Sequence, residues 1–211
     1  MTESIPLDND EYKTPADARP SLLCRCLPGS TLPFYFYILR NVFGGSREAC
    51  SGRFSDEVFV KRSHEIVRSV EKCGGKVHIT GLDTLRTLDR PVVFIGNHMS
   101  TMETFVLPGL ILPFVPLTFV IKQSLATMPV FGRIMQTQDP IMVTRQNPRA
   151  DLKAVITGGL EKLASGRSVC IFPQSTRRPR FNVSEFNSLG AKLAVRAEVP
   201  VVPVASKTDF W

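Results

Sequence analysis

The chain has 211 residues, of which 43% are hydrophobic and 21% charged, so it can build one sizeable core but not two. Its formal net charge is +7, yet residues 1–20 carry a net −3, which leaves +10 on the remainder. A basic body of this kind suits an anionic partner: a nucleic acid, an acidic membrane surface or a phosphorylated ligand.

The cysteines argue against both a disulfide framework and a metal site. Their number, five, is odd, and Cys24 and Cys26 form a C-x-C pair without a second pair at zinc-finger spacing or a histidine cluster. We therefore expect no metal, and we interpret the cysteines as reduced structural thiols. The N-terminus lacks the basic and apolar regions of a secretory signal peptide.

The first 75 residues are expected to form two parts. Residues 1–20 are polar, contain prolines and have little periodicity, which predicts a disordered acidic tail. Residues 21–75 are expected to be helical, with an aromatic-rich segment at 32–45 that ends in two glycines, and a helix over 55–73 that Ser55 can cap. Segment 32–45, with arginines around it, either lies on a membrane as an interfacial helix or packs on the domain.

From residue 76 onward, short apolar β-branched runs alternate with helical stretches. This alternation predicts an α/β fold with a mixed, mostly parallel sheet flanked by helices. Helices are predicted near residues 100–112, 150–165 and 187–197. The predicted strands are residues 76–80, 91–95, 116–121, 140–144, 168–172 and 199–205.

One uncharged run, residues 104–121, has eighteen positions and approaches the length of a membrane span. Pro108, Pro113 and Pro116 would each interrupt the hydrogen bonds of a spanning helix. A buried helix, a turn and a buried strand explain this run better.

His98 follows the predicted strand 91–95, at the kind of position where open α/β sheets bind their ligands. Residues 100–103 have the S-x-x-E form of a capping box, in which Glu103 would accept a hydrogen bond from a backbone N–H at the start of the next helix. Glu103 could instead orient the imidazole of His98 and stabilise its protonated form, with His98 as a general base. Both interpretations stay open at this point.

Basic and hydroxyl side chains follow three other predicted strands, and guanidinium and hydroxyl groups together suit a phosphate. Arg178 and Arg180 are better explained as part of a solvated basic loop. The candidate phosphate ligands are Arg145, Ser175, Thr176, Arg177 and Lys207.

Four short blocks, in this order and spacing, resemble the glycerolipid acyltransferase family that makes phosphatidic acid, the 1-acyl-sn-glycerol-3-phosphate acyltransferases and their relatives. The family's blocks are N-H-x4-D, an Arg after an apolar strand, F-P-E-G-T-R, and V-P-x-x-P-V. Any single block is weak, but the four together, over roughly residues 75–209, are specific. The corresponding residues are Asn97, His98 and Glu103; Arg145; Phe172, Pro173, Gln174, Ser175, Thr176 and Arg177; and Val199, Pro200, Pro203 and Val204.

The resemblance implies a glycerol-3-phosphate acyltransferase-like fold and acyl transfer from acyl-CoA or acyl carrier protein to the free hydroxyl of lysophosphatidic acid. His98 would remove the hydroxyl proton, Glu103 would orient His98, and backbone N–H groups near residues 97–101 would stabilise the oxyanion. Arg145 and Arg177 would hold the phosphate, and no metal or other cofactor is implied. The expected partners are the lysophospholipid acceptor, the acyl donor and a membrane surface, with peripheral or monotopic attachment at the cytoplasmic face of the cytoplasmic membrane.

Three residues depart from the family's motifs: Glu103 replaces an Asp, Gln174 a Glu, and Ser175 a Gly. The resemblance implies a further strand and helix after the fourth block, so the acyltransferase domain, residues 76–211, is either truncated at its C-terminal end or a short natural variant. The alternative functions are a catalytically weak lipid- or membrane-binding protein on the same fold and an acyltransferase with another acceptor. Nucleic-acid binding is disfavoured, because the arginines at 177–180 lack interleaved aromatic residues.

Overall fold

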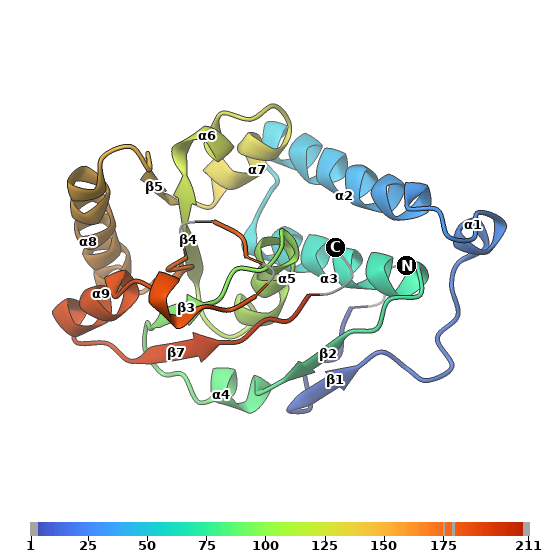
Figure 1. The fold of residues 1–211 in the computed structure, drawn as a ribbon, viewed down its shortest axis with the longest axis horizontal. Coiled ribbons are helices and arrows are strands. Elements are labelled where there is room, and N and C mark those ends of the chain that lie inside the picture. Colours follow the sequence, from blue (N-terminus) through green and yellow to red (C-terminus); the bar gives the residue numbers. More distant parts are fainter. Residues whose placement is uncertain (1–3, 175, 179, 209–211) are drawn as a thin grey trace.

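A five-stranded sheet forms the centre of the molecule in the computed structural model, which describes residues 4–174, 176–178 and 180–208 (Figure 1). The strand order is β5-β4-β6-β3-β7, and every neighbouring pair is parallel. This confirms the predicted α/β fold. The strands are β3 (Val93–Gly96), β4 (Leu117–Lys122), β5 (Ile141–Val143), β6 (Ser168–Ile171) and β7 (Val201–Val204).

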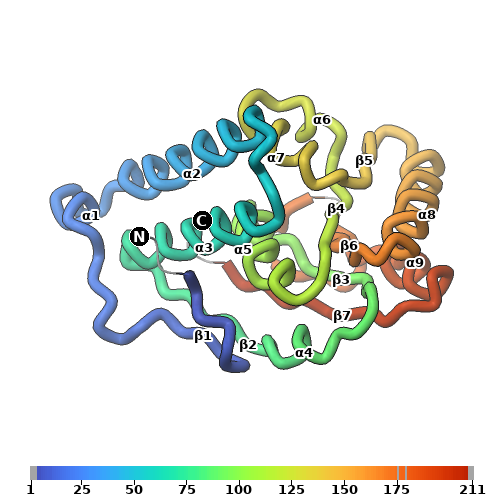
Figure 2. Tube along the Cα trace, turned by 180° about the vertical axis from the view of Figure 1, so that it is seen from behind, coloured from blue at the N-terminus to red at the C-terminus, as the bar shows by residue number. Residues whose placement is uncertain are grey.

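Helices cover both faces of the sheet, which is why its central strands are mostly apolar. One face packs against α8 and α9, and the other against a layer that contains α3 and α5, with α2 and α7 outside it (Figures 1 and 2). These helices are α2 (Leu32–Cys50), α3 (Asp56–Lys72), α5 (Met102–Ile111), α7 (Phe131–Thr137), α8 (Pro148–Ala164) and α9 (Leu189–Ala197). Shorter helices are α1 (Leu22–Cys26), α4 (Leu82–Arg86), α6 (Gln123–Ala126) and the 3-10 turn η1 (Val183–Glu185).

The apolar run 104–121 is divided between α5, a turn and β4, as the sequence predicted. Pro108 lies inside α5, and the chain leaves the helix before Pro113. Among the helices in the described part of the chain, none has both the length and the apolar character needed to cross a bilayer.

The predicted disorder of residues 1–20 is wrong for residues 4–20, which pack on the domain. Strand β1 (Glu11–Lys13) pairs antiparallel with β2 (His78–Thr80), so the predicted strand 76–80 belongs to a separate two-stranded sheet. Ile5 and Tyr12 are buried, and the Tyr12 hydroxyl donates a hydrogen bond to Glu71 over 2.6 Å. A few apolar side chains therefore anchor a segment whose average composition is polar.

Helix α2 does not end at its two glycines but continues to Cys50. A Cβ at Gly44 would lie 2.9 Å from the Arg62 guanidinium, and one at Gly45 would lie 3.0 Å from Ile134. The glycines thus allow α2 to approach α3 and α7 closely, and packing there outweighs their low helix propensity.

A buried histidine joins α3, α5 and the N-terminal segment. His64 on α3 is 5% exposed, its Nε2 lies 2.9 Å from the Gly109 carbonyl oxygen, and the Ile5 N–H donates to its Nδ1 over 3.2 Å. Because the Ile5 N–H can only donate, Nδ1 is the unprotonated nitrogen and Nε2 carries the hydrogen. Pro113, four residues after Gly109, has no N–H, so His64 supplies the hydrogen bond that α5 leaves open.

This arrangement requires a neutral His64, so we expect it to make the fold sensitive to acid. Burial lowers the pKa of His64 despite its hydrogen bond to Gly109. The unfolded chain then binds this proton more readily than the folded protein, and stability falls as the pH drops from about 6.5, the unfolded value, toward the folded pKa. Urea denaturation should show a loss of up to about 1.4 kcal/mol per pH unit in that window from this group alone.

The matched variant is His64→Gln, whose amide can donate to the same carbonyl but does not titrate. Its free energy of unfolding should depend less on pH between 6.5 and the folded pKa. Equal pH profiles for the two proteins would contradict the assignment of His64.

Candidate active site

The carboxyl ends of β3, β6 and β7 meet at one edge of the sheet, because these three strands are adjacent and parallel. The segments that follow them are tied together. The Asn97 side-chain amide donates to the Ser206 carbonyl oxygen and accepts from the Ser206 N–H, both over 2.7 Å. The Arg178 N–H donates to the His98 carbonyl oxygen over 2.9 Å. The chain segments that carry three of the four sequence blocks therefore converge here.

Two residues of the third block hold His98 in place. Its ring stacks on Phe172, with centroids 4.5 Å apart and an angle of 21° between the planes. Its backbone N–H donates to the side-chain oxygen of Gln174 over 2.7 Å, and Gln174 is 2% exposed. An amide oxygen can accept this hydrogen bond as a carboxylate can, so the change from Glu to Gln leaves this contact intact.

Glu103 makes the contacts that both interpretations of the sequence require. One carboxylate oxygen lies 3.2 Å from His98 Nδ1. The carboxylate also accepts hydrogen bonds from the N–H of Met99 over 3.2 Å and from the N–H of Ser100 over 3.0 Å, while the Ser100 hydroxyl accepts from the N–H of Met102 over 2.9 Å. The same carboxylate therefore belongs both to the capping box and to the His-carboxylate pair.

The Glu103 carboxylate is charged although it is 3% exposed. Burial alone would raise its pKa, but the hydrogen bond from His98 and those from the backbone N–H groups of Ser100 and of Glu103 itself outweigh burial and lower the pKa below its usual value. A negative charge held beside Nδ1 favours the tautomer with hydrogen on Nδ1 and leaves Nε2 of His98 as the basic nitrogen.

The expected oxyanion role of the backbone N–H groups near residues 97–101 needs correction. The N–H of His98 is bonded to Gln174, and those of Met99 and Ser100 are bonded to Glu103. These three donors hold the site together and are not directed at a substrate.

The structure ties one predicted phosphate ligand, Arg177, to the turn that follows His98. Arg177 donates a hydrogen bond to the hydroxyl of Thr101, at the start of α5, and both Arg177 and Thr176 are exposed. Ser175 lies outside the described residues. Arg178 pairs with Glu185 over 2.8 Å, which agrees with its interpretation as part of a solvated loop.

Arg145 lies farther from His98 than the other candidates. It follows β5, which is three strand positions from β3, or roughly 14 Å across the sheet. Its backbone has φ of 61°, and its N–H donates to Asp151 over 2.7 Å. To contact a phosphate beside His98, the side chain would have to extend back across the ends of β4 and β6.

A groove of about 760 Å³ opens beside Glu103, between β2 and β7, with α3 and α5 as its floor. Lys207 and Thr208 line it at the end of β7, and the Thr208 hydroxyl lies 3.4 Å from Glu103. Pro200 directly precedes β7, and Pro203 lies within it. Because β7 is an edge strand, the missing N–H of proline is tolerated there. The apolar floor is built mainly by Val67, Val70, Met102, Val106, Leu107 and Leu110.

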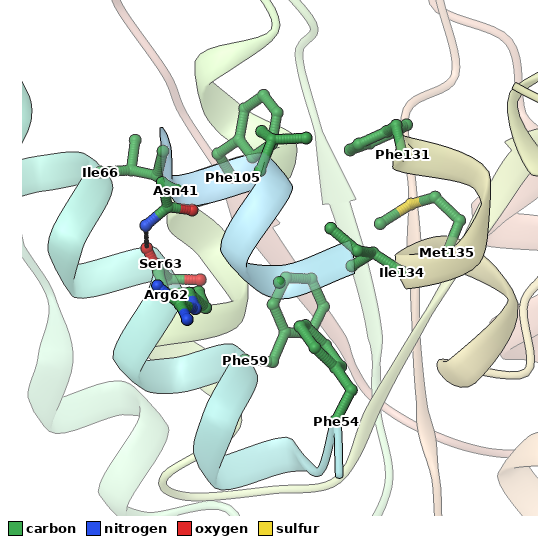
Figure 3. Close-up of a pocket in the computed structure, with 12 residues that line it drawn as sticks. Asn41, Phe54, Phe59, Arg62, Ser63, Ile66, Phe105, Phe131, Ile134 and Met135 are labelled. Atoms are coloured by element: carbon green, nitrogen blue, oxygen red, sulfur yellow. Dashed lines mark hydrogen bonds between the residues drawn. The ribbon is translucent and has the colours of Figure 1, made fainter. Parts of the chain in front are cut away.

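A second hollow, of about 20 Å³, lies among α2, α3, α5 and α7 and is lined mainly by aromatic and aliphatic side chains (Figure 3). It has room for about one water molecule. Within residues 4–174, 176–178 and 180–208, the Ser63 hydroxyl at this hollow is buried without a hydrogen-bond partner. The hollow contains none of the candidate catalytic residues.

Sequence reasoning missed three polar residues of the site: Thr101, Ser206 and Thr208. Each is a common residue in a loop, and only the fold shows that each contacts Arg177, Asn97 or Glu103. In the part of the chain that the structure describes, no three His, Cys, Asp or Glu side chains gather as metal ligands would.

Comparison with known proteins agrees with this geometry. The family model described as Acyltransferase matches residues 76–207. A 1-acyl-sn-glycerol-3-phosphate acyltransferase of Pseudomonas aeruginosa is 36% identical over 139 residues, which are 65% of this chain and 52% of that protein. A chloroplastic 1-acyl-sn-glycerol-3-phosphate acyltransferase of Arabidopsis thaliana is 29% identical and is matched over 61% of this chain and 35% of its own length.

The fold resembles the crystal structure of the 1-acyl-sn-glycerophosphate acyltransferase PlsC from Thermotoga maritima. The TM-score is 0.52 at 22% identity, with 82% of this chain and 70% of that chain covered. The chain spans about half the length, or less, of the curated relatives described above. The family match covers most of this chain, including β2, the central sheet and the site around His98. The chain therefore belongs to the acyltransferase family.

Proposed function

We propose that this chain transfers an acyl group from a thioester donor, acyl-CoA or acyl carrier protein, to the free hydroxyl of lysophosphatidic acid, giving phosphatidic acid. The observation that carries the proposal is the His98–Glu103 pair at the carboxyl end of β3, with Arg177 bonded to the adjacent Thr101. A base next to an exposed guanidinium suits an acceptor that carries both a hydroxyl and a phosphate.

In the proposed reaction, Nε2 of His98 takes the proton of the acceptor hydroxyl while the hydroxyl oxygen bonds to the thioester carbonyl carbon. Glu103 stabilises the resulting imidazolium through Nδ1, 3.2 Å away. The tetrahedral intermediate then expels the thiolate, which receives the proton from Nε2. Arg177 is the proposed phosphate ligand nearest His98, Lys207 is a second one at the groove beside Glu103, and Arg145 is a more distant candidate. The proposed reaction uses no metal and no cofactor beyond the acyl donor.

The test is a thiol-release assay on purified protein in detergent, with palmitoyl-CoA or palmitoyl-acyl carrier protein as donor and the lipid product identified by mass. Lysophosphatidic acid, lysophosphatidylcholine and glycerol 3-phosphate are offered in parallel. Phosphatidic acid formed only from lysophosphatidic acid supports the proposal. Product from another acceptor would show that the acceptor is not lysophosphatidic acid. A folded protein that binds lipid but forms no product would favour a non-catalytic lipid-binding function.

We also propose that the protein attaches peripherally to the cytoplasmic face of the membrane through α1 and α2. The buried side of α2 carries Phe34, Ile38 and Gly45. Its opposite side exposes large apolar residues at intervals of three and four, which places them on one stripe, and Arg25, Arg40 and Arg47 are exposed nearby. We call this surface the α1–α2 apolar face; its residues are Leu22, Leu23, Leu27, Leu32, Tyr35, Phe36, Leu39 and Phe43.

Replacing Phe36 and Phe43 together by Ser should weaken binding to phosphatidylglycerol-containing vesicles by about tenfold or more, because two large apolar side chains no longer enter the bilayer. Vesicle sedimentation measures this. Val195→Ser is the matched control, since Val195 is 77% exposed on α9, on the other side of the sheet. Equal vesicle binding by the double variant and the parent protein would contradict the assignment of this face.

A further inference from the structure

Two thiols from distant parts of the chain are in contact. Sγ of Cys24, in α1, lies 3.1 Å from Sγ of Cys73, the residue after α3, and the two cysteines are 49 positions apart. Both are free and partly buried. The S–S bond of a disulfide is about 2.05 Å long, so a movement of about 1 Å would allow the bond to form.

Hydrogen bonds around this pair connect the chain segments that carry the two cysteines. The Ser21 N–H donates to the Lys72 carbonyl oxygen over 2.8 Å, which fixes the start of α1 to the end of α3. The Ser21 hydroxyl accepts from the N–H of Cys24 over 3.3 Å and from the hydroxyl of Tyr37, on α2, over 3.0 Å. These hydrogen bonds hold the segment that carries Cys24 beside the end of α3, where Cys73 lies.

Helix α1 has little else to hold it. None of its five residues is buried in the described structure, and Leu22, Leu23 and Leu27 around it are exposed. A covalent link at Cys24 would constrain this segment far more than the capping hydrogen bonds do. We propose that Cys24 and Cys73 are a thiol–disulfide exchange site, at which a small-molecule disulfide such as glutathione disulfide reversibly links α1 to the end of α3.

The exchange proceeds in two balanced steps. Cys24 loses its proton to water, and its thiolate attacks one sulfur of the small disulfide, so that a mixed disulfide forms and one small thiolate leaves. Cys73 then loses its proton to water, and its sulfur attacks Sγ of Cys24 and expels the second small thiolate. Burial raises the pKa of Cys73 to about 12, which favours Cys24 as the first nucleophile.

Intact-mass measurement and peptide mapping after incubation with glutathione disulfide test the site. Trypsin cleaves after Arg25, which separates Cys24 from Cys26, and after Lys72 and Lys76, which frees Cys73 in a short peptide. We expect a loss of two hydrogen masses and a cross-linked pair of peptides, residues 14–25 and 73–76, that dithiothreitol separates. A link from Cys26 to Cys73, or glutathione adducts without a cross-link, would overturn the proposal.

Variants make the result specific. Oxidation should raise the melting temperature by roughly 5 °C or more, because the link closes a long loop of the unfolded chain. Cys73→Ser should abolish both the cross-link and the shift, whereas Cys50→Ser, at an exposed cysteine, should keep both. An equal shift in Cys73→Ser and the parent protein would contradict the assignment.

The disulfide should also affect membrane binding. This effect rests on the proposed membrane attachment through α1 and α2, whereas formation of the Cys24–Cys73 bond does not. Oxidation fixes the leucines of α1 relative to the domain, so vesicle affinity should differ between the oxidised and reduced parent protein but not between the same two preparations of Cys73→Ser. If the cross-link forms but vesicle binding does not change, the exchange site is supported and only its proposed effect on the α1–α2 apolar face is contradicted.

Discussion

Replacing His98 by Ala is expected to reduce acyl transfer by roughly 10²–10⁴-fold, the range that a positioned general base contributes. Nδ1 of His98 faces a buried carboxylate over 3.2 Å, and the ring is held against Phe172, so the tautomer and the orientation of the base are both fixed. No other histidine in the chain can replace it, because His64 is bonded to Gly109 inside the helical layer and His78 lies on β2 beside Glu11.

His78→Ala is the matched control for this experiment. It also removes a histidine paired with a glutamate, but one whose side chain is 54% exposed and whose partner is on β1. The thiol-release rate should fall far less in His78→Ala than in His98→Ala, because His78 lines the groove beside Glu103 without being bonded to that carboxylate, while circular dichroism shows a native fold for both. A His98→Ala protein that keeps more than about a tenth of the parent rate would remove His98 from the role of base.

The central strands of the sheet were predictable because they are buried on both faces. Residues such as Val92, Val93 and Phe94 are fully buried. A continuous apolar run of this kind can be recognised directly in the sequence. The pairing partner of residues 76–80 was not predictable in the same way. Their pattern predicts a strand, but the antiparallel pairing with residues 11–13 depends on Ile5 and Tyr12, two apolar residues isolated in a polar segment.

The sequence could name candidate site residues by their chemical type, but it could not give the contacts among them, which depend on distance in the fold. His98 and Arg177 stood out because each follows a predicted strand, and Glu103 stood out because it completes an S-x-x-E pattern at the start of a predicted helix. The sequence could not show that the N–H groups of residues 98–100 are used within the protein, because this depends on how the turn before α5 closes on Glu103 and Gln174. Nor could it show that Arg145 follows a strand three positions from β3, because strand order is a property of the fold.

Replacing Glu103 separates the two functions that one carboxylate combines. Glu103→Ala removes the acceptor for the N–H groups of Met99 and Ser100 at a position that is 3% exposed, and each unpartnered buried donor costs about 1–3 kcal/mol. We therefore expect about 2–5 kcal/mol less stability in urea denaturation, together with a loss of activity. The free energy difference should persist at pH 5, because the pKa of Glu103 is lowered and its contribution disappears only as the pH falls through that folded pKa.

Glu103→Gln keeps one oxygen for the cap but removes the negative charge beside His98. We expect its stability to lie much closer to that of the parent protein than that of Glu103→Ala, with a rate lowered by about a hundredfold, because the imidazolium loses its counter-charge. Glu103→Asp keeps the charge and shortens the side chain, so it should retain activity if the carboxylate can still reach Nδ1. Parallel measurements of rate and unfolding free energy decide between the roles: if Glu103→Gln loses stability but not rate, Glu103 is a cap and the His-carboxylate pair does not contribute to catalysis.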